Sequence, residues 1–458
     1  MLTLMLAMQA RVRPAGEPNH AKCFSMNTMT MQIVSVRARQ ILDSRGRPTV
    51  EADVMLTGGH TGRASVPSGA STGSAEAHEL RDGDPALYAG LSVLKAVGHV
   101  NVDIAKALTG HDALDQFALD RTLTGLDGTP QLSRLGANAV LAVSIATARA
   151  SAAALGQSLF ERVQSIAGQP TLSMPVPMVN ILSGGLHAGR GMDVQDFLAM
   201  PANATSVADA IHLLSRVRNA ATEEARARGL STLLADEGGI SPGLPSGRDA
   251  LDMMMRLIER AGLRPGHDIV IAIDVAATAF QDPQGGYALR REGRHATSAD
   301  MIEMLADWVK HYPVVSIEDG LGEEDWSAWA ELTRRVGHQV QLVGDDLFTT
   351  HPERLARGVR EHVANGVLVK ANQNGTLSGT IALIAQAKAA GYATIVSARS
   401  GETEDAFMSD LAVGTGAGQI KIGSLRTSST VAKYNQLLRI EEACGAPYPG
   451  LSALTGRS

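Results

Sequence analysis

Two kinds of hydrophobic pattern follow one another in the first third of the chain. Between residues 33 and 66, apolar and polar positions alternate, as in segment 50–54, and turn sequences stand at 43–46 and 58–59. This alternation predicts an antiparallel meander of short strands. Helical periodicity then dominates from about residue 87 to 165. The first part of the chain is therefore expected to be a small α+β domain.

Short apolar runs of strand length alternate with helical segments in the remainder of the chain. This repetition predicts an α/β fold, a (β/α)8-type barrel whose reactive face lies at the carboxyl ends of its strands. Only about a dozen residues separate the first two runs, too few for a crossover helix, so these strands should pair antiparallel. The expected strands lie near 177–181, 194–200, 231–234, 269–274, 314–318, 341–345, 366–370, 394–397 and 419–421. The expected helices lie near 206–228, 248–261, 298–310, 326–336, 353–362, 378–390, 404–413 and 430–444.

Closely spaced prolines separate the two parts. Pro170, Pro175 and Pro177 stand in one short stretch, and prolines interrupt helix and sheet ladder alike. The expected segments are a tail or mis-called start at 1–30, an N-terminal α+β domain at 31–168 and a barrel domain at 175–450.

Composition narrows the class of protein. The 458 residues are 44% hydrophobic and 19% charged, which is typical of a folded globular chain. A formal charge of −6 with dispersed Lys and Arg favours neither a nucleic-acid nor a membrane partner. The apolar run Leu2–Met8 is too short and lacks the basic segment of an export signal. Cys23 and Cys444 cannot form a disulfide framework, so we expect a cytoplasmic protein.

Three expected barrel strands end on an acidic residue. They close with Asp274, Glu318 and Asp345. Because the carboxyl ends of barrel strands meet at one rim, three carboxylates there suit a hard divalent cation. One acidic strand end alone is most often a polar loop residue. Three in succession favour a divalent metal site.

Further reactive side chains belong to the same expected rim. Lys370 and Lys421 stand at strand ends, Glu237 precedes a Gly-Gly pair, and Arg399-Ser400 follows another strand. A single lysine at such a place is usually solvated, but one beside bound charge with restricted solvent can act as a base. An arginine can fork onto a phosphoryl group, and the serine adds a donor. The set indicates a site for a small phosphorylated carboxylate.

Longer strings of residues identify a family. They are 43–46 (DSRG), 67–73 (PSGASTG), 136–139 (GANA), 236–239 (DEGG), 316–320 (SIEDG), 344–347 (GDDL), 400–405 (SGETED) and 432–442 (AKYNQLLRIEE). With these strings, from about Ile33 to Cys444, the chain resembles the enolases, the phosphopyruvate hydratases of glycolysis. Strings of this length and specificity do not arise by chance.

The resemblance implies a fold, a reaction and a set of residue roles. It implies the enolase-type barrel with an antiparallel second strand, and a hydro-lyase that reversibly dehydrates 2-phospho-D-glycerate to phosphoenolpyruvate. Glu237 would be the proton donor and Lys370 the proton acceptor, and the enolase superfamily combines such a base with Mg²⁺. Two Mg²⁺ per active site are implied, held by Asp274, Glu318 and Asp345, with Ser71 of a loop joining the second. Implied substrate-binding residues are His187, Gln195, Asp196, Lys370, Arg399, Ser400 and Lys421. A homodimer or higher homo-oligomer is also implied. Secretion or display at the cell surface is suggested for this chain only by analogy with the family.

Several positions depart from the family pattern. Ala398 stands where the family usually has His, Asp196 where it has Glu, and Leu186 where a small or polar residue is usual. Segment 427–430 replaces an Arg-Ser-acid-Arg sequence. Each change alone is compatible with drift at a tolerant position. Together they surround the expected substrate, and a displacement of about 1 Å at a positioned group costs about a hundredfold in rate.

Three hypotheses for the function follow. The first is enolase itself, since the metal ligands, both proton-transfer residues and the phosphate-binding pair are present. The second is an enolase-like paralogue that acts on an analogue of 2-phosphoglycerate, of the carboxyphosphonoenolpyruvate synthase type in phosphonate biosynthesis, with Ala398 making room for an altered phosphoryl group. The third is a non-catalytic binding or scaffold protein, against which the presence of Lys370 and Glu237 speaks.

Overall fold

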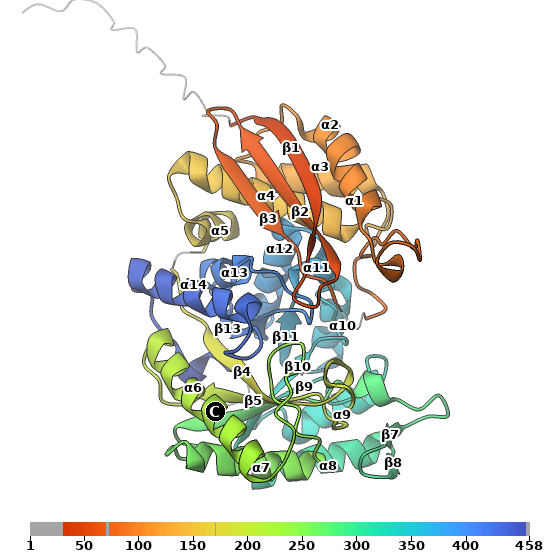
Figure 1. The fold of residues 1–458 in the computed structure, drawn as a ribbon, viewed down its shortest axis with the longest axis vertical. Helices are drawn as coiled ribbons and strands as arrows, with labels where there is room; N and C mark the ends of the chain where they lie inside the picture. Colours follow the sequence, from red (N-terminus) through yellow and green to blue (C-terminus); the bar gives the residue numbers. More distant parts are fainter. Residues whose placement is uncertain (1–30, 70–72, 170, 455–458) are drawn as a thin grey trace, which may run out of the picture. The chain divides into compact units, whose positions relative to one another are not determined.

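The structure, a computed structural model, describes residues 31–69, 73–169 and 171–454 (Figure 1). The expected tail at 1–30 and the loop residue Ser71 lie outside these described residues. Residues from Met31 onward form one compact unit. The bounds expected for the two domains within it stay a prediction.

The first part of this unit is a three-stranded antiparallel sheet with helices behind it (Figure 1). Its strands are β1 (Ile33–Leu42), β2 (Pro48–Leu56) and β3 (Thr61–Ser65), as the alternating pattern predicts. The reversal between β1 and β2 passes through Gly46, whose φ of 71° suits glycine. The helices are α1 (Leu94–His99), η2 (Val100–Ile104), α2 (Ala105–Leu108), α3 (Gln116–Asp127), α4 (Ala137–Leu155) and α5 (Leu159–Ala167), with a short η1 turn at Tyr88–Gly90.

Helix α4 is the core of this part. It is apolar around almost its whole circumference and packs against β2 and β3, which explains why it lacks a polar face. Gly62 of β3 allows the close approach, since a Cβ there would stand 2.1 Å from the Ala146 carbonyl oxygen. The helix is long and apolar enough to cross a membrane, but 78% of its apolar window is buried within the fold, as in a core helix.

The second part is a closed eight-stranded barrel (Figure 1). Its strands are β4 (Val176–Ser183), β5 (Asp196–Pro201), β6 (Ile269–Asp274), β9 (Val314–Glu318), β10 (Gln341–Gly344), β11 (Gly366–Val369), β12 (Ala393–Ser397) and β13 (Gly418–Lys421). Apolar residues from neighbouring strands, among them Val176, Leu198, Val270 and Leu368, fill its interior.

Helices connect and surround the barrel strands. They are α6 (Val207–Ala227), α7 (Gly247–Arg260), α8 (Ser298–His311), α9 (Trp326–Val336), α10 (Pro352–Glu361), α11 (Ala371–Asn374), α12 (Leu377–Ala389), α13 (Phe407–Thr415) and α14 (Ser428–Cys444). Four of the longer helices begin with a Ser or Thr N-cap that accepts a backbone N–H, at Ser206, Ser246, Thr297 and Thr376. Short elements η3 (Leu186–Ala188), η4 (Ala277–Phe280), β7 (Tyr287–Leu289), β8 (Arg294–Ala296) and η5 (Gly450–Ala453) lie in the connections.

One expected strand is wrong. Segment 231–234 forms no strand, and Leu234 makes only an isolated bridge to Ile240. Its apolar residues do not enter the core, since Leu233 is 76% and Leu234 42% exposed. A short apolar run forms a barrel strand only where it is buried, and the sequence of the run alone does not show whether it is buried.

The second barrel strand runs against its neighbours, as expected. β5 pairs antiparallel with both β4 and β6. Its first residue, Asp196, therefore lies at the rim where β6 and β9 end, in register with Asp274, which is in turn in register with Glu318. The reversed strand thus brings a third acidic residue to the same level of the barrel.

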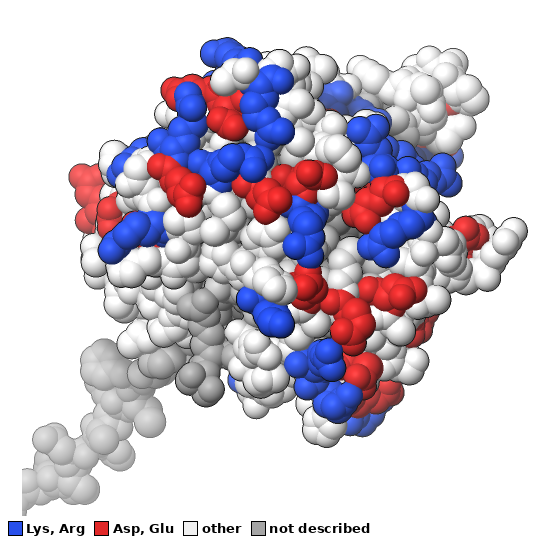
Figure 2. All heavy atoms as spheres, turned by 90° about the horizontal axis from the view of Figure 1, so that it is seen from below, with Lys and Arg blue, Asp and Glu red and all other residues white. Residues whose placement is uncertain are grey.

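Charges of both signs cover the face seen in Figure 2. Lys and Arg side chains alternate there with Asp and Glu side chains. Ion pairs between barrel helices include Arg260 with Glu223 at 3.4 Å and Arg248 with Asp307. Exposed pairs of this kind contribute roughly 0–1 kcal/mol each, so their main effect is on the surface and not on the stability of the barrel.

Candidate active site

The predicted metal ligands lie on three adjacent barrel strands. Asp274 ends β6, Glu318 ends β9, and Asp345 follows β10 by one residue. Asp274 and Glu318 are register partners, and both are almost fully buried. The strand order of the barrel therefore gathers these carboxylates, which are 44 and 27 residues apart in sequence, at one rim.

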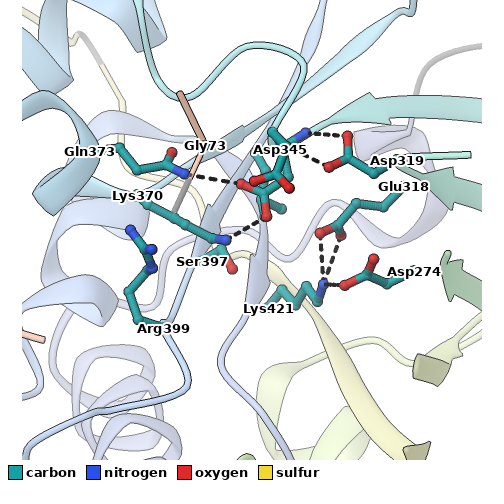
Figure 3. Close-up of polar contacts among 12 residues, drawn as sticks. Gly73, Asp274, Glu318, Asp319, Asp345, Lys370, Gln373, Ser397, Arg399 and Lys421 are labelled. Atoms are coloured by element: carbon teal, nitrogen blue, oxygen red, sulfur yellow. Dashed lines mark hydrogen bonds and ion pairs between the residues drawn. The ribbon is translucent and has the colours of Figure 1, made fainter. Parts of the chain in front are cut away.

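Two lysines hold these carboxylates (Figure 3). Lys421 Nζ donates to Asp274 Oδ2 at 2.7 Å and to both oxygens of Glu318 at 2.8 Å. Lys370 Nζ donates to Asp345 Oδ2. Burial alone would lower the pKa of Lys421, but Asp274 and Glu318 outweigh it and raise that pKa well above its usual value. Burial and then Asp274 raise the pKa of Glu318 well above its usual range. A positive charge therefore stabilises this cluster of buried carboxylates.

The three carboxylates suit Mg²⁺ as ligands, although two of them contact Lys421 and the third contacts Lys370. Carboxylate oxygens on neighbouring strands are the hard ligands that Mg²⁺ takes, and the lysine contacts show that the cluster stabilises a cation. Asp274 and Glu318 both contact Lys421, whereas Asp345 contacts Lys370. The three carboxylates are therefore not the most closely spaced group of candidate metal ligands. Among the described residues, sets with one candidate ligand atom each within 4.8 Å of one another are His187–Asp196–Glu237 and Asp319–Asp345–Asp346.

The turn after β10 is fixed by a neighbouring acid. Both oxygens of Asp319 accept backbone N–H groups, from Asp345 at 2.9 Å and from Asp346 at 2.8 Å. Gln373 Nε2 donates to Asp345 Oδ1 at 3.2 Å from another side (Figure 3). Asp345 is thus held through its main chain by Asp319 and through its side chain by Gln373.

Glu237 lies beside His187. His187 Nδ1 is 3.7 Å from Glu237 Oε1, and His187 Nε2 is 3.3 Å from Asp196 Oδ2. Asn180 Nδ2 donates to Glu237 Oε2 at 3.1 Å. Asp196 is fully buried and also accepts from Ser183 Oγ at 2.5 Å, so it lies behind His187 and not on the cavity wall.

The pKa of Glu237 is shifted in the direction opposite to that expected of a proton donor. A proton donor should have a raised pKa, and burial does push it upward. His187, Lys421 and Lys370 outweigh burial and lower the pKa of Glu237 to about 2. For His187, burial would lower the pKa, but Asp196 and Glu237 raise it well above its usual value. The proton of this group therefore belongs to His187, next to Glu237.

One cavity receives most of the predicted site residues. Its described lining residues are Leu186, His187, Gln195, Glu237, Asp274, Asp345, Lys370, Ser397, Ala398, Arg399, Ser400 and Lys421. Gln195 Nε2 donates to Asp274 Oδ2 at 3.0 Å. Asp196 and Glu318 are not among these lining residues, and Glu318 contacts the cavity through Lys421. Acids, two lysines and an arginine thus face one small polar space.

Comparison with known families agrees with this geometry. Residues 33–163 match the family model described as the enolase N-terminal domain. Residues 171–455 match the model described as the enolase C-terminal TIM barrel domain. The chain belongs to the enolase family. Enolases use Mg²⁺ and bind a phosphorylated carboxylate, which suits the acidic rim and the arginine of this cavity.

Sequence reasoning missed several side chains of this enolase-family site. Asn180, Asp319 and Gln373 contact Glu237 or Asp345, and Glu76 contacts Arg399. Asn180 had a detectable signal, because a fully buried polar residue inside an apolar strand needs a partner. Glu76 had none, because the side chains that it contacts, Gln373 and Arg399, are about 300 residues away in sequence.

Proposed function

We propose that the protein catalyses the Mg²⁺-dependent, reversible loss of water from 2-phospho-D-glycerate, giving phosphoenolpyruvate. The observation that carries this proposal is the single cavity that Lys370, Glu237, Lys421 and Arg399 share with the acidic rim. The reaction needs a base, an acid, a cation for the carbanion charge and an anchor for the phosphoryl group. The cavity offers one candidate for each.

In this mechanism Lys370 Nζ takes the proton from the carbon next to the substrate carboxylate. Lys370 must be neutral to accept this proton. Burial alone would lower the pKa of Lys370, but Asp345 and Glu318 outweigh burial and raise that pKa. Lys370 therefore becomes a base only when its hold on Asp345 is released. Mg²⁺ held by Asp274, Glu318 and Asp345 would supply positive charge. This charge would replace the contacts of the carboxylates with the lysines, and it would stabilise the negative charge that develops on the substrate.

The other residues bind the substrate and handle the second proton. The Lys421 ammonium faces the carboxylate on which charge develops, and Arg399 with Ser400 holds the phosphoryl group. Loss of hydroxide as water needs a proton at Glu237. His187, whose Nδ1 lies 3.7 Å from Glu237 Oε1, is placed to hold a proton beside that carboxylate.

Purified protein tests the proposal directly. Incubation with 2-phosphoglycerate should produce the ultraviolet absorbance of phosphoenolpyruvate with Mg²⁺ and none with a chelator. The Lys370→Ala variant serves as the inactive control. No product from the parent protein at any Mg²⁺ concentration would refute the proposed reaction.

A second candidate is the same chemistry on an analogue of 2-phosphoglycerate, of the carboxyphosphonoenolpyruvate synthase type. The observation that favours it is the apolar part of the cavity wall. Among the described lining residues, Leu186 and Ala398 are apolar and stand in an otherwise polar site. Ala398 precedes the anchor Arg399, so it leaves room beside the phosphoryl group where an imidazole would stand in other enolases. Parallel turnover assays with the two substrates distinguish the candidates.

Family membership also supports a homodimer or higher homo-oligomer in the cytoplasm. Light scattering of the full chain during gel filtration measures the oligomeric state. A monomer at micromolar concentration would exclude the assembly.

A further inference from the structure

Glu76 is a buried carboxylate beside the cavity that has no part in the proposed proton transfers or metal binding. It is 8% exposed and lies in the segment between β3 and the first helices. Its Oε1 accepts from the Gly73 backbone N–H at 2.9 Å and from Gln373 Nε2 at 3.1 Å. Its Oε2 accepts from Arg399 Nη1 at 2.9 Å. One side chain thus joins a loop of the first part of the chain to two elements of the barrel rim.

The contact with Arg399 fixes a guanidinium group. Arg399 Nη2 is also 3.4 Å from Glu76 Oε1, so the two side chains meet edge to edge, and both are almost fully buried. The main chain of Arg399 is held from another side, where its N–H donates to Glu402 Oε1 at 2.9 Å. Glu402 is in turn paired with the fully buried Lys433 at 3.1 Å. A charged pair in such surroundings has one favoured geometry, because a long side chain can leave it only by stranding a buried charge.

The second arm of Glu76 reaches a predicted metal ligand. Gln373 Nε2 donates to Glu76 Oε1 and also to Asp345 Oδ1, at 3.1 and 3.2 Å. Figure 3 shows Gln373 above and Arg399 below the Lys370 side chain, so the two residues flank the Lys370–Asp345 pair. The orientation of the anion anchor and that of the acidic ligand therefore depend on one carboxylate.

We propose that Glu76 is a positioning residue that aims Arg399 at the phosphoryl group of the substrate. The role rests on the proposed function, which makes Arg399 the phosphoryl anchor. Glutamine cannot replace this carboxylate. Its amide has one acceptor oxygen, so its NH2 group must face either Arg399 Nη1 or the donors Gly73 N–H and Gln373 Nε2. Either choice sets donor against donor and moves the guanidinium.

The experiment is a double-mutant cycle between Glu76→Gln and Arg399→Gln, with Glu79→Gln as the matched control. Glu79 is a partly buried acid three residues along the same segment whose carboxylate accepts from Arg81. In the parent background, E76Q should lower kcat/KM for 2-phosphoglycerate about tenfold or more, because a displacement of about 1 Å at an anchor costs up to a hundredfold. In the R399Q background the same change should cost several-fold less than in the parent background, because only the contact through Gln373 to Asp345 is left to lose. E79Q should lower kcat/KM far less than E76Q, because Glu79 pairs with Arg81 and its charge acts less strongly on Arg399 than that of Glu76.

A role in packing alone predicts other results. It gives a loss that is the same in both backgrounds and that follows the fall in melting temperature, and such additivity overturns the inference. A loss below fivefold in the parent background overturns it as well.

Calorimetric titration with inorganic phosphate at saturating Mg²⁺ separates this inference from the proposed function. E76Q should weaken phosphate binding at least fivefold relative to the parent, and E79Q should weaken it far less. If the parent produces no phosphoenolpyruvate, the proposed reaction fails while the phosphate titration still tests Glu76. Equal phosphate affinity in the parent and E76Q, or no phosphate binding by the parent, overturns the positioning role.

Discussion

Replacement of Lys421 by Met tests whether the acidic rim is a cation site without any need for turnover. Lys421 Nζ lies within 2.8 Å of Asp274 Oδ2 and of a Glu318 oxygen, so these oxygens are at most about 5.6 Å apart. Two unit charges at that distance repel by about 3 kcal/mol at an effective dielectric constant of about 20. Removal of one partner of a buried ion pair costs about 3–5 kcal/mol. Met keeps the length of the side chain and removes only the charge.

The assay is thermal unfolding of Lys421→Met and of the parent, in chelator and in Mg²⁺. In chelator the variant should melt roughly 4 °C lower, from about 4 kcal/mol divided by an unfolding entropy near 2.1 cal/mol/K per residue. Mg²⁺ should raise the melting temperature of the variant more than that of the parent, since the cation replaces the missing charge between the same carboxylates.

Lys388→Met is the matched control for this experiment. Lys388 is half-buried and donates to the Thr415 carbonyl at 2.6 Å, so its loss removes a hydrogen bond but leaves no carboxylate uncompensated. Its response to Mg²⁺ should equal that of the parent. The reasoning is refuted if Lys421→Met is as stable as the parent in chelator, or if Mg²⁺ shifts both proteins equally.

Three further changes probe the base, the cavity wall and a buried acid. Lys370→Ala should lower turnover by about a thousandfold or more while circular dichroism stays unchanged, and parent-like activity would remove Lys370 from its role. Ala398→His should raise kcat/KM for 2-phosphoglycerate if the protein is a weakened enolase, and should obstruct an analogue if that is the true substrate; unchanged kinetics with both would defeat the steric argument. Burial raises the pKa of Asp410, on α13, from 3.8 to about 6, so the folded state holds that proton more tightly and stability is lost as pH rises from about 4 to about 6. Asp410→Asn should therefore stabilise the protein at pH 8 by on the order of 2–3 kcal/mol and leave it unchanged near pH 4, and equal gains in urea unfolding at both pH values would contradict this account.

The barrel and its rim were predictable because their physical causes are local. The apolar runs that end on Asp274 and Glu318 predict both a strand and an acid at its carboxyl end. The barrel topology then brings these strand ends together. The antiparallel β5 followed from the length of one connection. Segment 231–234 failed for the converse reason, since its burial depends on what lies around it.

The electrostatics of the site were beyond the sequence. The pKa of Glu237 depends on His187, 50 residues away in the chain, and on two lysines, Lys370 directly after β11 and Lys421 at the end of β13. The partners of Lys370 and Lys421 could be guessed as acids but not assigned, because several acids share the rim. Glu76 shows the same limit, since side-chain contacts between distant segments leave no periodic trace in the residues themselves.

The reversed strand β5 has a consequence for how this molecule can diverge. In an ordinary β/α unit the loop at the reactive end leads down a helix to the opposite end, but here segment 184–195 leaves the rim at β4 and returns to it at β5. Ser183 and Asp196 close its base by register and by a hydrogen bond. Both ends of this segment therefore lie at the mouth of the cavity. Its sequence can change, as at Leu186, without altering the spacing of any helix in the barrel.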